Sequence, residues 1–211
     1  MASAVIHLAV AKVLEPYFDI KNRKDYYLGS IAPDIAKQIG RTKQESHFLY
    51  EEKDDVPNIK MFTNKYPNFY KNDFDLGYYI HLFTDKLWFD KFLNTLVQSN
   101  SIRLIDGTIV NVPPEELPQL IYSDYTNLNV KVIEEYNMDL SLFYEEFEKP
   151  KTSIDEVPIE QLNILIDKMG IIIENSTNEK NYIFDIYLIK EFIETTKERI
   201  LKEIKDYEQN S

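Results

Sequence analysis

The segment from Asp73 to Gln98 limits the possible folds of this chain more than any other stretch. Its apolar spacing predicts one long helix, with Asn72 or Asp73 as the N-cap residue. The stretch GYYIHLFTDKLWF inside it is so rich in apolar side chains that it belongs to a protein core. Two residues of that stretch, His81 and Asp85, carry polar groups, and their presence in a core helix has to be explained.

The composition of the rest of the chain also favours helices. Among 211 residues there are only 5 glycines and 9 prolines, and the good helix formers Leu, Ile, Glu and Lys are common. The hydrophobic fraction of 44% is ample for one core and argues against disorder. We therefore predict an all-α fold that forms a single helical domain over residues 1–211. Further helices are expected at residues 3–15, about 114–136, 140–148, 158–169 and 181–207.

Turn-forming residues interrupt the helical pattern at three places. The stretch DYYLGSIAPDIAKQIG begins as a short helix and breaks between Gly29 and Pro33, which are expected to shape a turn. Residues 41–70 are polar and contain two prolines, so a long loop with short helices is expected there. The dipeptide Asp106–Gly107 lies between β-branched runs and predicts a small β-hairpin near residues 102–112.

The charge and the residue types present exclude several classes of protein. A formal net charge of −12, without a long cluster of Lys or Arg, argues against binding to nucleic acid or to an anionic membrane. There is no cysteine, so any metal ion must be held by nitrogen and oxygen atoms. No apolar run reaches the length of a transmembrane helix. The N-terminal stretch lacks the basic region of a secretory signal and is interrupted by Lys12, so a cytoplasmic protein is expected.

His81 and Asp85 are four residues apart, so their side chains project from the same face of the predicted helix. This spacing allows both to bind one metal ion, although a buried histidine hydrogen-bonded to an aspartate gives the same pattern. His7 lies on the first predicted helix, His47 lies in a loop, and the turn described above can present Asp34 to a cleft. Together the five residues form a set of nitrogen and oxygen ligands that suits zinc and leaves Mn²⁺ or Fe²⁺ open.

In their order and spacing these residues resemble the zinc-dependent phospholipases C, a family related to the single-strand-specific zinc nucleases. The resemblance covers about residues 1–95 and is carried by His7, Gly29–Asp34, Ser46–Phe48 and Gly77–Asp85. It implies a helical protein that hydrolyses phosphoric diester bonds. It also implies one zinc ion held by Asp34, His47, His81 and Asp85. Asp85 would in addition bridge to a second ion contacted by His7.

The chain departs from that family in two respects. Family members have a processed N-terminal tryptophan that binds a metal ion, whereas this chain begins with Met1, and no histidine follows His81 to supply the family's later ligands. We therefore expect one complete four-ligand site within residues 1–98, with a second ion left open, and additional packing helices in residues 114–211. Among the later acids Asp124 is the best candidate to replace a missing ligand, but an exposed helical acid is the interpretation that we favour for it.

The expected function is that of a zinc-dependent hydrolase acting on the phosphoester bond of a small or phospholipid-like substrate. Asp34, at the edge of the metal site, is the expected catalytic residue, because it could orient or deprotonate the attacking water. One alternative is a non-catalytic metal-binding or interaction protein that retains part of the site. The other is a structural helical protein whose histidines are core residues. The adjacent His-Asp pair of HD-type phosphohydrolases and the motifs HExxH and GxSxG are absent, and the oligomeric state stays open.

Overall fold

The computed structural model describes residues 1–98, 100–144, 146 and 148–210, and most of them are helical. The α-helices of this described part are α1 (Ala4–Leu14), α2 (Arg23–Gly29), α3 (Ile35–Gln38), α4 (Ile59–Lys65), α5 (Asp73–Leu87), α6 (Asn94–Leu96), α7 (Leu117–Glu135), α8 (Leu162–Glu174) and α9 (Ile186–Asn210). The short 3₁₀ segments are η1 (Glu15–Tyr17), η2 (Ala32–Asp34), η3 (Phe69–Lys71), η5 (Ser141–Phe143) and η6 (Ile159–Gln161). The predicted all-α fold class is confirmed.

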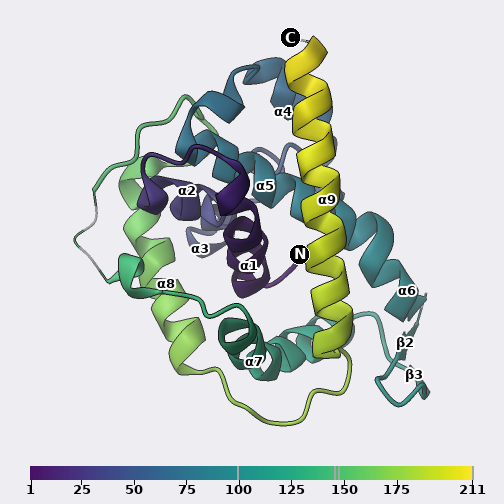
Figure 1. The fold of residues 1–211 in the computed structure, drawn as a ribbon. Helices are drawn as coiled ribbons and strands as arrows, with labels where there is room; N and C mark the ends of the chain where they lie inside the picture. The colour runs from purple at the N-terminus through teal and green to yellow at the C-terminus, as the bar shows by residue number, and fades with distance from the viewer. Residues whose placement is uncertain (99, 145, 147, 211) are drawn as a thin grey trace.

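The core forms around the two most apolar helices, α1 and α5. Nearly every side chain of α5 is buried, and so are most of those of α1. Helix α2 packs along α5, α7 packs against α1, and the long α9 contacts both α1 and α5. Figure 1 shows α1 near the middle of the molecule, with α9 on one side and α8 on the other. Burial of each large apolar side chain contributes about 1.5–3 kcal/mol, so these two helices anchor the fold.

Helices α2 and α5 cross with their backbones in direct contact, because each has a glycine at the crossing. A Cβ atom on Gly77 would lie 2.1 Å from the carbonyl oxygen of Tyr26. A Cβ atom on Gly29 would lie 2.1 Å from the carbonyl oxygen of Phe74. Gly29 was expected to shape a turn, but it is the last residue of α2, and it allows the close approach of the two helices. The chain turns only after it, through Ser30 and into η2.

The predicted helix over residues 73–98 is interrupted. Regular α-helix ends at Leu87, and a π-helical segment, η4 (Trp88–Leu93), and the short α6 follow it. A π segment adds a residue to one turn and rotates the side chains that come after it. Trp88 starts this segment and is fully buried beside Phe92 and Phe184, as expected for a core residue.

A small antiparallel sheet with the order β1-β2-β3 completes the fold (Figure 1). Its strands are β1 (Val97–Gln98), β2 (Ser101–Arg103) and β3 (Ile109–Asn111). The predicted hairpin is confirmed between β2 and β3, and Gly107 in its turn has a φ of +85°. Such a positive φ is easily adopted only by glycine.

Three of the further expected helices differ from the structure. The helix expected at residues 158–169 starts with the 3₁₀ segment η6 and continues as α8 to Glu174. In the stretch 140–148 the described residues form only the 3₁₀ segment η5, and residues 145 and 147 lie outside the described part of the chain. A helix of so few residues is marginal without extensive packing. The last helix begins at Ile186 and not at 181, because the backbone of residues 182–184 is bound by Asp124. Among the described residues, no helix is both long enough and apolar enough to span a membrane.

Candidate metal centre

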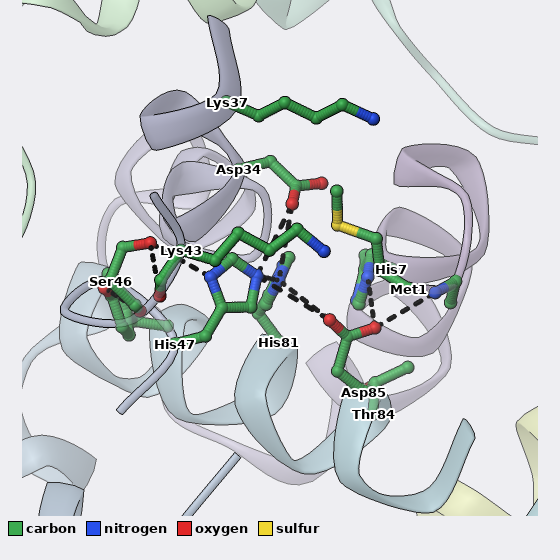
Figure 2. A network of polar contacts seen from close by, with 12 residues as sticks. Met1, His7, Asp34, Lys37, Lys43, Ser46, His47, His81, Thr84 and Asp85 are labelled. Atoms are coloured by element: carbon green, nitrogen blue, oxygen red, sulfur yellow. Dashed lines mark hydrogen bonds and ion pairs between the residues drawn. The ribbon is translucent and has the colours of Figure 1, made fainter. Parts of the chain in front are cut away.

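All three histidines of the chain meet two aspartates at the centre of the molecule (Figure 2). His7 comes from α1, Asp34 from the end of η2, His47 from the turn before α4, and His81 and Asp85 from α5. All five residues are buried. Segments far apart in the sequence thus bring together the five residues proposed as metal ligands.

The ring of His81 is held in one orientation by the backbone of α2's C-terminal end. Its Nδ1 atom lies 2.9 Å from the carbonyl oxygen of Ser30, which can only accept a hydrogen bond. Nδ1 therefore carries the proton, and the lone pair of Nε2 is free. That Nε2 atom lies 3.8 Å from Oδ2 of Asp85, one helical turn away, and 4.0 Å from Oδ1 of Asp34.

His47 faces the same point from the opposite side. Its Nδ1 atom lies 2.9 Å from the hydroxyl oxygen of Ser46, which fixes the ring. Its Nε2 atom lies 3.5 Å from Oδ1 of Asp34, 3.7 Å from Oδ2 of Asp85 and 3.3 Å from Nε2 of His81. The residue after it, Phe48, has a φ of +53°, so the chain bends sharply as it leaves the site.

Asp85 presents its two oxygens to different neighbours. Oδ2 faces His47 and His81, as described above, whereas Oδ1 lies 3.3 Å from Nε2 of His7. Oδ1 also accepts a hydrogen bond of 3.0 Å from the backbone N–H of Ala2. The ring of His7 stacks on that of His81 with 3.8 Å between the ring centroids. A carboxylate shared in this way has the form of a bridge between two sides of one cluster.

Several buried atoms of the cluster lack a hydrogen-bond partner among the described residues. They are Oδ1 of Asp34, Oδ2 of Asp85 and both ring nitrogens of His7. A buried polar group without a partner costs about 1–3 kcal/mol, and more if it is charged. Ligand atoms of His7, Asp34 and His81 lie within 4.8 Å of one another, and so do those of His47, His81 and Asp85. A cation coordinated by the first group would give the orphaned oxygen of Asp34 a partner, and one coordinated by the second would do so for Asp85, so the residues fit a metal ion.

The electrostatics of the cluster also suit a cation. Burial disfavours the charged form of His81 and, with His7 beside it, lowers the pKa of His81 to about 3. Burial alone would raise the pKa of Asp34, but the imidazoles of His47 and His81 outweigh it and lower the pKa to about 2. Burial alone would also raise the pKa of Asp85, but His7, the N-terminal amine and His81 together outweigh it, so this pKa lies well below its usual value. At neutral pH two carboxylates therefore face a neutral imidazole.

The cluster is accessible from one side. A cavity of about 450 Å³ reaches it at Asp34, and α3, α7, α8 and the N-terminal residues line this cavity. The side chain of Asp34 is 10% exposed, whereas those of the other four residues are between 0% and 2% exposed. A small molecule would therefore approach the cluster along Asp34.

Asp124 lies apart from the cluster. Its carboxylate accepts hydrogen bonds from the backbone N–H groups of Tyr182, Ile183 and Phe184, at 2.7 to 3.2 Å, and from the side chain of Asn181. It is 4% exposed, so the expectation of an exposed acid was wrong. The aspartate anchors the segment before α9, and its oxygens are already bound there.

No family model, curated protein or solved structure matches this chain. The chemistry of the centre therefore has to be inferred from its own residues. Sequence reasoning missed the groups that orient the histidines, the carbonyl of Ser30 and the hydroxyl of Ser46. It also missed Lys37 and Lys168, which line the cavity. Lys37 follows Asp34 by three residues, which is the one sequence signal that pointed to it.

Proposed function

We propose that the protein is a metal-dependent hydrolase of phosphoester bonds, with zinc bound by the cluster. The observation that carries the proposal is the set of orphaned, buried ligand atoms next to a cavity of small-molecule size. Imidazole and carboxylate groups without cysteine suit zinc and also accept Mn²⁺ or Fe²⁺. Asp34, His47, His81 and Asp85 would hold one ion, and His7 with the second oxygen of Asp85 would contact another.

The chain's own groups have separate roles in this reaction. A bound zinc ion supplies a water of lowered pKa and offsets negative charge on the phosphoryl oxygens. Asp34, ionised and at the cavity end of the cluster, orients the attacking water and accepts its proton. Ser30 and Ser46 keep His81 and His47 aimed at the ion. Burial of the other four ligands excludes bulk water from every side but the cavity.

A non-catalytic metal site is the alternative. Four protein ligands in a closed environment are typical of structural zinc sites, and four of these five residues are almost fully buried. The cavity at Asp34 favours catalysis, because a structural ion needs no path for a small molecule. A hydrolase and a non-catalytic metal site would both bind metal, but only the hydrolase would turn over a substrate.

The test combines metal analysis with a substrate panel. Protein purified without chelator should contain about one or more equivalents of zinc, and it should hydrolyse at least one phosphomonoester or phosphodiester. Asp34→Asn should lower turnover by about a hundredfold or more. The exposed Asp90→Asn is the control and should leave turnover unchanged. Metal binding without turnover on any substrate would favour the non-catalytic alternative, and no metal binding after reconstitution would disprove the centre itself.

A further inference from the structure

The cavity beside Asp34 has the opposite charge from the rest of the molecule. The whole chain has a formal net charge of −12. The charged side chains that line this cavity are Asp34, a proposed metal ligand, and two lysines, Lys37 and Lys168. Apart from the ligand, the charged side chains lining the cavity in the described part of the chain are thus cationic. Positive charge in a hollow with low-dielectric walls attracts and concentrates anions.

Lys37 is fixed at the cavity by α7. It lies on α3, and its Nζ atom donates a 3.0 Å hydrogen bond to the hydroxyl oxygen of Tyr122. The same atom lies 4.5 Å from the centroid of the Tyr122 ring, which adds a cation–π contact. Figure 2 shows the side chain of Lys37 beside that of Asp34. No salt bridge to Lys37 occurs within the described residues, so its charge is available to a ligand.

Lys168 provides a second charge from α8. Its side chain is half-buried, and among the residues described it has no carboxylate partner within salt-bridge distance. Helix α8 contacts α3, η2 and α7, so both lysines stand on elements that pack together around the cavity. The remaining lining comes mostly from apolar and amide side chains, such as Ile171, Ile172 and Asn129. A compact organic group can be accommodated there without a further charge.

We propose that this cavity is the substrate-binding pocket and that Lys37 and Lys168 select a compact phosphomonoester dianion over a phosphodiester. The inference rests on the proposed function and specifies its substrate class. A phosphomonoester carries close to two negative charges above pH 7, because its second pKa is about 6, whereas a diester carries one. Two lysines and a metal ion therefore stabilise the bound dianion of a phosphomonoester more than the monoanion of a phosphodiester. The volume of about 450 Å³ suits a small leaving group.

The hydrolysis balances without another reactant. The oxygen of water forms a bond to phosphorus, and the bond from phosphorus to the ester oxygen breaks. One proton of the water passes to Asp34 and then to the departing ester oxygen, which leaves as an alcohol. Inorganic phosphate is the second product, and Asp34 returns to its ionised state.

Calorimetry with inorganic phosphate tests the pocket without turnover. The zinc-reconstituted protein is titrated at about pH 8 with phosphate, a dianion there, and with dimethyl phosphate, a monoanion. Lys37→Gln and Lys168→Gln should each weaken phosphate binding about tenfold and affect dimethyl phosphate much less. Lys202→Gln on the exposed side of α9 changes the net charge equally and should have no effect. Equal phosphate affinity in all four proteins would overturn the proposal.

A kinetic comparison distinguishes this inference from the proposed function. The ratio of kcat/KM for 4-nitrophenyl phosphate to that for bis(4-nitrophenyl) phosphate should exceed one in the parent and fall about tenfold in each lysine variant. Tyr122→Phe keeps both lysines and should reduce the ratio less. Hydrolysis with a preference for the diester would overturn the inference and leave the proposed function intact. Lysine-dependent phosphate binding with no turnover would contradict the proposed function and support the pocket.

Discussion

The two ring nitrogens of His81 have different partners, and this difference determines what the residue can do. Nδ1 donates to the Ser30 carbonyl, which leaves Nε2 as an acceptor among His47, Asp34 and Asp85. If Nε2 of His47 carries a proton, it donates to Nε2 of His81 at 3.3 Å; if both Nε2 atoms present a lone pair, a cation between them removes their repulsion. Binding of an ion therefore requires the His47 proton to be on Nδ1, where the hydroxyl oxygen of Ser46 can accept it.

Substitution of either His81 or Asp85, the two proposed ligands on α5, should remove the metal and preserve the fold. His81→Ala and Asp85→Asn each delete a ligand that contacts several others, so we expect most of the bound zinc to be lost. Far-ultraviolet circular dichroism should remain close to that of the parent protein. Asp90→Asn, on the next turn and exposed, is the matched control. Full zinc occupancy in both site variants would show that the pair is only structural.

Substitution of His7 tests whether the centre binds one metal ion or two. The Nε2 atom of His7 lies 3.3 Å from Oδ1 of Asp85, and its ring stacks on that of His81, whereas Oδ2 of Asp85 faces His47 and His81. We expect His7→Ala to remove a weakly bound second ion and any hydrolytic activity, because four other ligands suffice for the first ion. Calorimetric titration with zinc measures the number of ions. The same stoichiometry and affinities in both proteins would make His7 a core residue.

Acidification should destabilise the metal-free protein through His81. The pKa of His81 is lowered from 6.5 to about 3, because burial favours the neutral ring. Above pH 6.5 the folded and unfolded states are both neutral at this residue, and its contribution does not change. Below pH 6.5 only the unfolded state gains the proton, so the free energy of unfolding falls by up to about 1.4 kcal/mol per pH unit.

Urea unfolding between pH 7 and pH 4 measures this dependence. His81→Gln, which does not titrate, should flatten the curve in the upper part of that range. Below about pH 4 the aspartates Asp34 and Asp85, whose pKa values are lowered, add their own loss of stability as pH falls. An identical pH dependence in the parent and in His81→Gln would show that the pKa of His81 is the same in the folded and unfolded states.

At the scale of helices, the crossing of α2 and α5 places the Ser30 carbonyl beside His81. Gly77→Ala would bring a methyl group to 2.1 Å from the Tyr26 carbonyl oxygen. We expect a loss of about 1–3 kcal/mol in the free energy of unfolding and weaker zinc binding, because the helices must separate. Gly170→Ala in α8 has open space around the new methyl group and should be neutral or slightly stabilising. The free energy of unfolding and the zinc affinity should be measured for both variants and compared.

The elements that sequence predicted best are those with long, regular apolar spacing. The helices that became α1, α7 and α9, and the hairpin at Gly107, were predicted within a few residues, whereas α5 was predicted to continue to residue 98 and ends at Leu87. All five proposed ligands were identified from residue type, spacing and a family resemblance, and they lie together. Each is a rare or conspicuous residue in its segment, such as the only three histidines of the chain.

The parts that sequence did not predict depend on contacts between distant segments. Asp124 looks like an ordinary helical acid until the residues 182–184 close over it. The π segment at Trp88 follows from packing and not from local spacing. Likewise, Lys37 and Lys168 are ordinary lysines in the sequence, and only the packing of α3, α7 and α8 makes them neighbours of one cavity.

At the scale of the whole molecule, two buried aspartates hold the long connections in place. Asp75 accepts hydrogen bonds from the hydroxyls of Thr152 and Ser153, in the connection between η5 and η6. Asp124 holds the connection before α9 in place by accepting hydrogen bonds from its backbone N–H groups. These anchors keep the C-terminal helices packed on α1 and α3, so the second half of the chain covers a centre built by the first half.

The burial of the ligands has a consequence for the rate of metal exchange. A chelator could reach an ion bound at the proposed centre only along Asp34, because the side chains of the other four proposed ligands are at most 2% exposed. Zinc release to a chromogenic chelator should therefore be slow, and phosphate in the cavity should slow it further. Release at the same rate with and without phosphate would mean that the ion leaves by another route. Slow release would make the ion a kinetically trapped component, loaded as the chain folds and then retained for the lifetime of the protein.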